Sequence, residues 1–412
     1  MSADHIVNIK GRELIDSKGR PMIEVEVECA GGAKGFAAAP CGTSVGSYEG
    51  MVLRDHGVRF GGLGTLKAVE QVKTSIAPGL SGMEAFDQNA IDKKLIALDG
   101  TEDKSKLGAN TIYSTSVAVA RAAAVTKNMP LFKHLVKKKK YLLPKPMLNS
   151  INGGTYGEIN CGIQEFLTIP VKMESFAKTY RKSVEIFYAI EKRIKQSLGT
   201  NQLFLGNSLG HAAPYAESHK NIDLLIAAIE DAGYGDEFVI GLDCAANEFY
   251  DSTSHLYHLD NQTFDTNSLS EYWIELIEKY PLHFLEDPFC EDDFEAHQHL
   301  THKTDKVYIA GDDLLATNPN RLKIAAGMGA CNAIIFKPNM IGTVSEALET
   351  AVLAHKKGYN IVPSIRSGGG VDDPIADFAL AVGAGFIKCG APRSGERIVV
   401  QNQLLRLEEI LD

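Results

Sequence analysis

The chain has 412 residues, a formal net charge of −10 and 44% hydrophobic residues. This length exceeds what one ordinary hydrophobic core holds, so we expect more than one domain. The acidic balance excludes a broad nucleic-acid-binding surface, because little positive charge is available to neutralise phosphates.

The first third of the chain has the pattern of three strands followed by helices. Alternation of apolar and polar residues predicts strands at Ile6–Asp16, Met22–Ala30 and Gly35–Ala39, the first two joined as a hairpin. A segment of small residues, Cys41–Ser47, follows and is expected to be mobile. Helical periodicity resumes near Leu66–Ile76, Met83–Leu98 and Ala109–Thr126. We expect residues 1–135 to form an α+β domain that caps the rest of the chain.

After Pro146 the pattern changes to short apolar runs separated by helices. Two irregular strands are predicted at Met147–Ile151 and Glu165–Ile169, and a long helix is predicted from the capping residue Ser175 toward Leu198. The later runs end on Asp243, Glu286, Asp312, Lys337, Ser364 and Lys388. Successive ends are about 24 to 43 residues apart, the length of a strand, a helix and two loops. We therefore expect residues 140–412 to form a (β/α)8-type barrel, which makes the fold class α/β.

The residues that end these runs predict a chemical site. Each follows its apolar run, so their side chains should gather on the C-terminal face of the barrel. Three acids, Asp243, Glu286 and Asp312, suit a hard metal ion, and Lys337 with Lys388 suits acid/base chemistry. The alternative is that strand ends simply carry solvated charge. That alternative is favoured for a single acid, but not for five such endings in register.

The cysteines and the amino terminus indicate the compartment. Seven cysteines occur singly without a CxxC spacing, which is typical of reduced thiols in a cytoplasmic protein. Residues Met1–His5 have neither the basic nor the apolar region of a signal peptide, and no apolar stretch approaches 18 residues. We expect no export and no membrane span.

Many ordered segments of the chain match one family pattern. They are Arg12–Pro21, Leu98–Thr101, Lys104–Lys106, Gly108–Asn110, Asn152–Gly154, Gln164–Phe166, Leu242–Ala246, Glu286–Phe289, Gly311–Leu314, Lys337–Thr343, Ile387–Ser394 and Asn402–Glu409. Together they cover nearly the whole length, and the chain resembles the enolase family. The resemblance implies a homodimer in which Arg12 pairs with Glu409, and Glu24 with Arg406, between subunits.

The resemblance also implies roles for the site residues. Asp243, Glu286 and Asp312 would bind Mg²⁺, and Lys337 would remove the proton α to a carboxylate. The remaining substrate-contacting and catalytic positions would be Lys388 on that carboxylate, Arg366 and Ser367 on a phosphate, and Gln164 and Glu165 beside them. An α-proton next to a carboxylate is weakly acidic, so a hard cation must stabilise the second negative charge. We expect the lysine and metal neighbours of Lys337 to disfavour its ammonium form, so that it accepts a proton near neutral pH.

The chain departs from the family at groups that protonate a leaving hydroxyl. The family loop Gly-Asp-Glu-Gly-Gly, whose Glu assists hydroxyl departure, reads Gly-Asn-Ser-Leu-Gly at Gly206–Gly210. Tyr156 and Ile365 stand where the family has histidines, and Cys41 replaces a Ser that helps bind a second Mg²⁺. Glu165 is retained. Because serine is not a strong acid, loss of positioned acid catalysis is expected to slow ordinary dehydration by about 10²- to 10⁴-fold.

Three functions remain open. The first is an Mg²⁺-dependent lyase that enolises a phosphorylated or phosphono three-carbon acid resembling 2-phosphoglycerate, with an altered second step. The second is an ordinary phosphopyruvate hydratase with a rebuilt acid, for which His211, Glu158 and Glu165 are candidates. His211 is more readily interpreted as an exposed loop histidine. The third is a non-catalytic binding protein, which the selective retention of base, ligands and phosphate groups disfavours.

Overall fold

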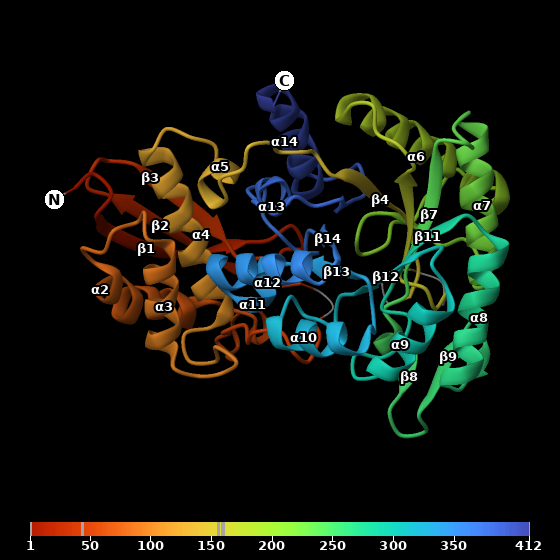
Figure 1. Cartoon of the computed structure of the whole chain (residues 1–412), viewed down its shortest axis with the longest axis horizontal. Coiled ribbons are helices and arrows are strands. Elements are labelled where there is room, and N and C mark those ends of the chain that lie inside the picture. Colours follow the sequence, from red (N-terminus) through yellow and green to blue (C-terminus); the bar gives the residue numbers. More distant parts are fainter. Residues whose placement is uncertain (1, 43–44, 155–156, 158–160, 412) are drawn as a thin grey trace.

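The structure is a computed structural model that describes residues 2–42, 45–154, 157 and 161–411. An amino-terminal sheet with its helices lies beside a larger barrel, as Figure 1 shows in red to orange and in yellow to blue. The expected fold class is confirmed. Tyr156 and Glu158 lie outside the described residues.

The amino-terminal sheet is an antiparallel meander. Its strands, in the order β1-β2-β3, are β1 (Ile6–Ile15), β2 (Pro21–Cys29) and β3 (Lys34–Ala38). The predicted hairpin turns at Gly19, whose φ of 75° lies in the left-handed region that glycine tolerates. Oδ1 of Asp16 accepts the backbone N–H groups of Lys18 and Arg20, each at 2.8 Å, which fixes the turn.

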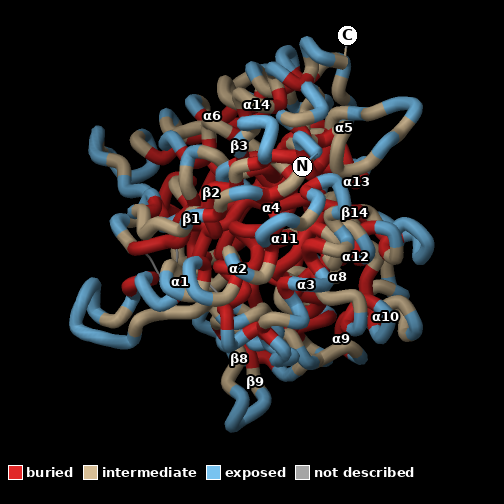
Figure 2. Tube along the Cα trace, turned by 90° about the vertical axis from the view of Figure 1, so that its left-hand side faces the viewer, coloured by how far each residue is buried: buried red, intermediate tan, exposed pale blue. Residues whose placement is uncertain are grey.

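Helices cover this sheet on one side. They are η1 (Arg59–Gly62), α1 (Leu66–Gln71), η2 (Val72–Ile76), α2 (Ala77–Leu80), α3 (Gln88–Asp99), α4 (Ala109–Thr126) and α5 (Leu131–Leu135). Helix α4 packs on β2 and β3 and is buried along most of its length, as Figure 2 shows. The predicted helix from Met83 begins only at Gln88, because the Asp87 side chain accepts the N–H of Ala90 and caps α3 there.

Eight strands of the described chain form the barrel. They are β4 (Lys145–Asn152), β5 (Glu165–Pro170), β7 (Phe238–Asp243), β11 (Leu282–Glu286), β12 (Tyr308–Gly311), β13 (Ala333–Phe336), β14 (Asn360–Pro363) and β15 (Phe386–Gly390). From β4 to β14 each strand pairs with the next in this order, and β15 pairs with β4. A bridge between Ser364 and Lys388 joins the two remaining ends, with the Ile365 N–H donating to the Lys388 carbonyl at 3.1 Å. Buried residues including Met147, Phe284 and Ile335 fill the interior.

The outer elements complete the barrel. They are α6 (Phe176–Leu198), β6 (His211–Ala212), α7 (Ser218–Asp231), η4 (Ala246–Phe249), β8 (Tyr250–Asp251), β9 (Leu256–Leu259), β10 (Gln262–Phe264), α8 (Thr266–Lys279), α9 (Phe294–Lys303), α10 (Pro319–Met328), α11 (Pro338–Ile341), α12 (Val344–Lys356), α13 (Ile375–Val382) and α14 (Gly395–Leu411). Ser175 caps α6 as predicted, accepting the Lys178 N–H at 3.2 Å. Among the described helices, none is both long and apolar enough to span a membrane.

Strand β5 explains the irregular start of the barrel. It runs antiparallel to both β4 and β7, and its first residue, Glu165, pairs with Asp243 at the last position of β7. The sequence rule that chemical groups follow their apolar run therefore does not hold for Gln164 and Glu165, which stand at the start of one. Because the strand is reversed, its beginning lies at the same end of the barrel as the other strand ends.

Candidate active site

The strand ends enclose a cavity at the C-terminal face of the barrel. Its volume is about 660 Å³, including space open to solvent at the mouth. The predicted site residues that line it are Gln164, Glu165, Asp243, Asp312, Lys337, Arg366, Ser367 and Lys388. Glu286 is also in place, because it contacts Lys388 from the end of β11. The structure thus brings together the predicted metal ligands, the two lysines and the predicted substrate-binding residues.

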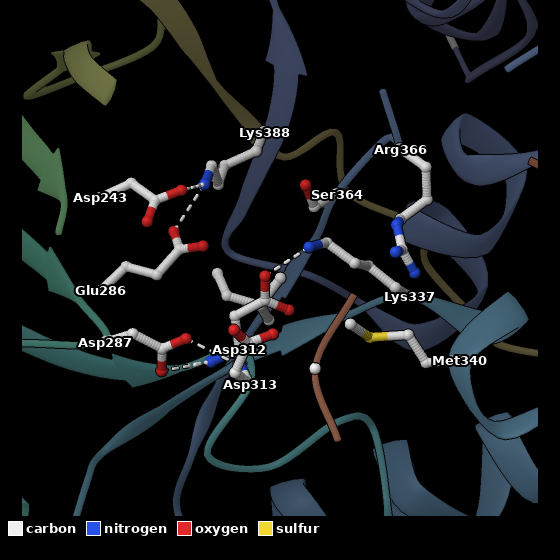
Figure 3. A network of polar contacts seen from close by, with 12 residues as sticks. Asp243, Glu286, Asp287, Asp312, Asp313, Lys337, Met340, Ser364, Arg366 and Lys388 are labelled. Carbon is white, nitrogen blue, oxygen red and sulfur yellow. Dashed lines mark hydrogen bonds and ion pairs between the residues drawn. The ribbon is translucent and has the colours of Figure 1, made fainter. Parts of the chain in front are cut away.

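Lys388 is held between carboxylates from neighbouring strands. Its Nζ lies 2.8 Å from Oδ2 of Asp243, 2.6 Å from Oε2 of Glu286 and 3.4 Å from Oε2 of Glu165. Figure 3 shows the first two of these contacts. Burial by itself lowers the pKa of Lys388, but the carboxylates outweigh burial and raise this pKa well above its ordinary value. Lys388 is therefore a fixed positive charge.

Lys337 forms a second pair. It follows β13, and its Nζ donates to Oδ2 of Asp312, which follows β12. Burial lowers the pKa of Lys337, but the Asp312 carboxylate and other nearby acids outweigh it, and the pKa is raised. The expectation of a disfavoured ammonium form concerned Lys337 beside a bound metal ion, and it stays a prediction.

A third group of acids lies next to this pair. Ligand oxygens of Asp287, Asp312 and Asp313 lie within 4.8 Å of one another and could hold a metal ion. Asp287 already accepts the backbone N–H groups of Asp312 at 2.9 Å and of Asp313 at 2.7 Å. Burial and the neighbouring Asp312 raise the pKa of Asp313 to about 7. Asp287 thus fixes the turn after β12, and Asp312 and Asp313 are the more available ligands.

The acids of the cavity fit a divalent cation. Oε1 of Glu286 and Oδ1 of Asp312 are buried and have no hydrogen-bond partner among the described residues. Burial raises the pKa of Asp243 and, in greater degree, that of Glu286, because their charges are not fully compensated. Oxygen ligands of this kind are those that Mg²⁺ prefers.

Arg366 has a partner that the sequence did not suggest. Its Nη1 lies 2.7 Å from Oε2 of Glu49 and its Nη2 lies 3.1 Å from Oε1, in a bidentate pair. The two side chains are only 4% and 5% exposed. Ser367 lies next to Arg366 and its hydroxyl donates to the Asn207 carbonyl at 3.4 Å. These groups form the cationic wall of the cavity.

The altered loop after α6 places a serine against Glu165. The Ser208 hydroxyl donates to Oε1 of Glu165 at 2.7 Å, and the Asn149 amide donates to the same oxygen at 3.2 Å. Both Ser208 and Asn149 line the cavity. Glu165 is therefore the carboxyl group that this side of the cavity presents, and position 208 contributes a neutral hydroxyl.

The positions of three further residues, His211, Cys41 and Ile365, bear on their interpretation from the sequence. His211 is fully buried rather than exposed, because it lies in β6 and stacks on Phe187 with the ring centroids 4.3 Å apart. Burial lowers its pKa to about 4, and it does not line the cavity. Cys41 packs with Met22 and Ala38 in the amino-terminal domain, which favours a space-filling role. Ile365 lines the cavity as an apolar residue.

Two site residues escaped the sequence analysis for different reasons. Asp313 directly follows the predicted ligand Asp312, and this doubled acid was a visible signal. Glu49 comes from a loop of the amino-terminal domain, 317 positions from Arg366, and no local pattern marks it.

The chain matches known proteins along its whole length. Residues 6–135 match the family described as "Enolase, N-terminal domain", and residues 140–412 match "Enolase, C-terminal TIM barrel domain". The chain belongs to the enolase family. This confirms the resemblance drawn from the sequence, and with it membership of a family of carbon–oxygen lyases that are typically metal-dependent.

Named relatives agree with this assignment. The enolase of Methanococcus aeolicus is 44% identical over 404 residues, which are 98% of this chain and 95% of the relative. The enolase of Methanopyrus kandleri is 42% identical over 98% of this chain and 96% of the relative. The enolase of Thermococcus gammatolerans is 43% identical over 99% and 95%.

Proposed function

We propose that this enolase-family enzyme removes the α-proton of a small three-carbon acid bearing a phosphate or phosphonate group, and completes the reaction by a step other than ordinary dehydration of 2-phosphoglycerate. The observation that carries the proposal is the joint position of Lys337, Lys388 and Arg366 around one cavity with three strand-end carboxylates. These groups supply a base, a carboxylate partner and an anion partner.

The contacts of these residues support the following proposed roles. Asp243, Glu286 and Asp312 would hold Mg²⁺, which when bound supplies positive charge beside the substrate carboxylate as a second negative charge develops. Lys337, which lies beside Asp312, would take the α-proton when its amine is uncharged. Lys388, kept cationic by its neighbours, would bind the carboxylate. Arg366 and Ser367 would bind the phosphate or phosphonate.

The altered second step is supported by the loop at Gly206–Gly210. By the resemblance, Ser208 stands where the family has its acid, and its hydroxyl donates a hydrogen bond to Glu165. A hydroxyl of this kind cannot protonate a leaving group strongly near neutral pH, because its ordinary acidity is too weak. The groups for the first half of the reaction are therefore present, whereas the group for hydroxyl departure is changed.

The test follows deuterium incorporation at the α-carbon in D₂O with Mg²⁺, using 2-phosphoglycerate and three-carbon phosphono acids. We expect exchange in the wild type and no exchange in Lys337→Ala. Lys357→Ala, on the exposed end of α12, is the matched control and should exchange normally. Absence of exchange with every acid would contradict the proposal; tight Mg²⁺ binding in that case would fit a non-catalytic binding protein.

A second candidate is phosphopyruvate hydratase itself. It is favoured by the name of the relatives, at 42–44% identity over almost the whole chain, and by the retention of Glu165 in the cavity as a possible acid. Formation of phosphoenolpyruvate from 2-phosphoglycerate, measured by the absorbance of the product, distinguishes the hydratase from the enzyme with an altered second step. Turnover in the wild type that is lost in Glu165→Gln would establish the hydratase; proton exchange without this product supports the altered step.

We also propose a homodimer and a cytoplasmic location. Residues 1–135 and 140–412 would form two domains of each subunit. The Arg12 guanidinium pairs within the chain with Glu24 at 2.6 Å and is 40% exposed, so part of it is accessible to Glu409 of another copy. All seven cysteines are free and buried, which agrees with reduced thiols. A monomer at micromolar concentration in analytical ultracentrifugation would contradict the dimer.

A further inference from the structure

The strap, defined here as residues 46–50, links the amino-terminal domain to the barrel beside the cavity. The Ser47 hydroxyl donates to Oε1 of Glu291 at 2.6 Å, and the Tyr48 hydroxyl donates to Oδ1 of Asp292 at 2.6 Å. Both contacts are exposed, and exposed polar contacts of charged groups contribute little free energy. They orient the strap but do not hold it strongly.

Glu49 supplies the buried contact of the strap. Its carboxylate pairs bidentately with Arg366, and one of the same oxygens accepts the Gly46 N–H at 3.1 Å. Because both charges are almost fully buried, leaving either one alone would be strongly unfavourable. This ion pair is therefore the buried charged contact of the strap. The strap is also held by the Gly50 N–H, which donates to the Met340 carbonyl at 2.8 Å, and by the Tyr48 ring, which lies under the Arg321 guanidinium.

The backbone of the same loop also covers Arg366. Gly42 has a φ of 66°, and a Cβ at this position would overlap the Arg366 guanidinium. The carbonyl of Gly42 accepts a hydrogen bond from Nη1 of Arg20 at 2.9 Å. Arg366 is thus enclosed by groups from the amino-terminal domain on two sides, although it comes from the barrel.

We propose that Glu49 is a positioning residue that orients Arg366 for the substrate anion, so that attachment of the strap and binding of the phosphate or phosphonate favour each other. A guanidinium presents N–H donors on more than one edge, so one side chain can contact a carboxylate and a second anion. Glu49 restricts the Arg366 side chain before the anion binds. Arg366 therefore loses less conformational freedom when the anion binds.

The direction of this coupling decides between two roles for Glu49. If the carboxylate only competes with the substrate anion for Arg366, its removal strengthens anion binding. If it positions the guanidinium, its removal weakens anion binding and loosens the strap together, because linkage between two sites is reciprocal. The inference rests on the proposed role of Arg366 in binding the phosphate, and it concerns equilibrium binding rather than turnover.

The test uses the full chain with Mg²⁺ and inorganic phosphate as the probe. Calorimetry gives the Kd for phosphate, and hydrogen exchange gives the protection of the strap amides with and without phosphate. In Glu49→Gln we expect the Kd to rise about tenfold and the strap to exchange faster, with less protection gained from phosphate. Glu49→Asp, which keeps the charge on a shorter side chain, should recover part of both effects.

Ser47→Ala is the matched control in the same strap. It removes an exposed contact to Glu291 and leaves the Arg366 pair in place, so phosphate affinity should stay within about twofold of the wild type. Thermal unfolding of each variant verifies that it is folded. An unchanged or tighter phosphate Kd in Glu49→Gln, or a wild type that binds no phosphate, overturns the inference. If phosphate binding is coupled to attachment of the strap but no α-proton exchange occurs, this inference stands and the proposed reaction is refuted.

Discussion

Lys388 compensates more negative charge than any other single side chain described in the cavity. Its ammonium group contacts carboxylates from three strands, β5, β7 and β11. Such a cluster is stable only while its charges are balanced, since an uncompensated buried charge is strongly unfavourable. Charge balance at this one residue therefore affects both stability and metal affinity.

Replacing Lys388 tests this balance. Lys388→Met should lower the free energy of unfolding by about 3–5 kcal/mol, because Asp243 and Glu286 lose their partner. Mg²⁺ should then raise the midpoint of thermal unfolding more in the variant than in the wild type, since ligand binding to the folded state stabilises it. Lys306→Met removes an exposed pair with Glu278 and should change stability by at most about 1 kcal/mol. Equal effects of the two substitutions would refute the argument.

Gly42 allows a second test at the same scale. Gly42→Ala places a methyl group against Arg366 and also forces a residue with a side chain into a left-handed conformation. Gly19 has a φ of 75° with open space around its Cβ position, so Gly19→Ala carries only the conformational cost, about 1–2 kcal/mol. In urea unfolding we expect Gly42→Ala to lose clearly more stability than Gly19→Ala. Equal losses would mean that the loop moves away from Arg366 at little cost.

At the scale of elements, a buried acid joins the two halves of the molecule. Asp92 in α3 accepts hydrogen bonds from the Ser116 hydroxyl of α4 at 2.6 Å and from the Ser345 N–H at the start of α12 at 2.8 Å. The Ser116 hydroxyl also accepts the Val344 N–H at 3.0 Å. These contacts satisfy the first amides of α12 from the amino-terminal domain.

Replacing Asp92 should reduce stability more than replacing an exposed helix cap does. Asp92→Ala leaves buried donors of Ser116 and Ser345 unsatisfied, and we expect a loss of about 2–4 kcal/mol in urea unfolding. Asp87→Ala removes the exposed cap of α3 and should cost about 1 kcal/mol. A loss in Asp92→Ala no larger than in Asp87→Ala would show that water replaces the lost contacts.

The sequence predicted these elements unevenly, for physical reasons. The ends of β7, β11, β12 and β13 were predicted because a charged residue ends or follows each apolar run. This pattern can be read directly from a single sequence. The direction of β5 was not predicted, because the alternation of side chains along a strand is the same in both directions. The pair of Glu49 with Arg366 and the raised pKa of Lys337 depend on distances that only the folded chain sets. His211 was misjudged because a position near a loop says nothing about what packs against it.

At the scale of the whole molecule, buried histidines govern acid stability. His211 and His297 are fully buried, and burial lowers the pKa of each from 6.5 to about 4. Between these values the unfolded chain binds protons that the folded chain does not, so the free energy of unfolding falls as the pH falls from 6.5 toward 4. The stability that neutral histidines contribute is fully present above pH 6.5.

This pH dependence can be measured by urea unfolding at pH 7.5 and pH 5. Each buried histidine should reduce the free energy of unfolding by about 2 kcal/mol at pH 5. His211→Asn should therefore show a smaller difference between the two pH values than the wild type. His219→Asn, an exposed residue of α7, should leave the difference unchanged. The same pH difference in all three proteins would rule out the histidine explanation.

The reversed strand β5 gives the barrel an unequal set of connections. The link between Asn152 and Glu165 leaves and re-enters the barrel at the same rim, whereas a link between parallel strands must travel the full height of the wall. A change in the length of that link leaves the register of the wall in place, because β4 and β5 pair through their own residues. Differences in length should therefore be tolerated there more readily than at the links that span the wall.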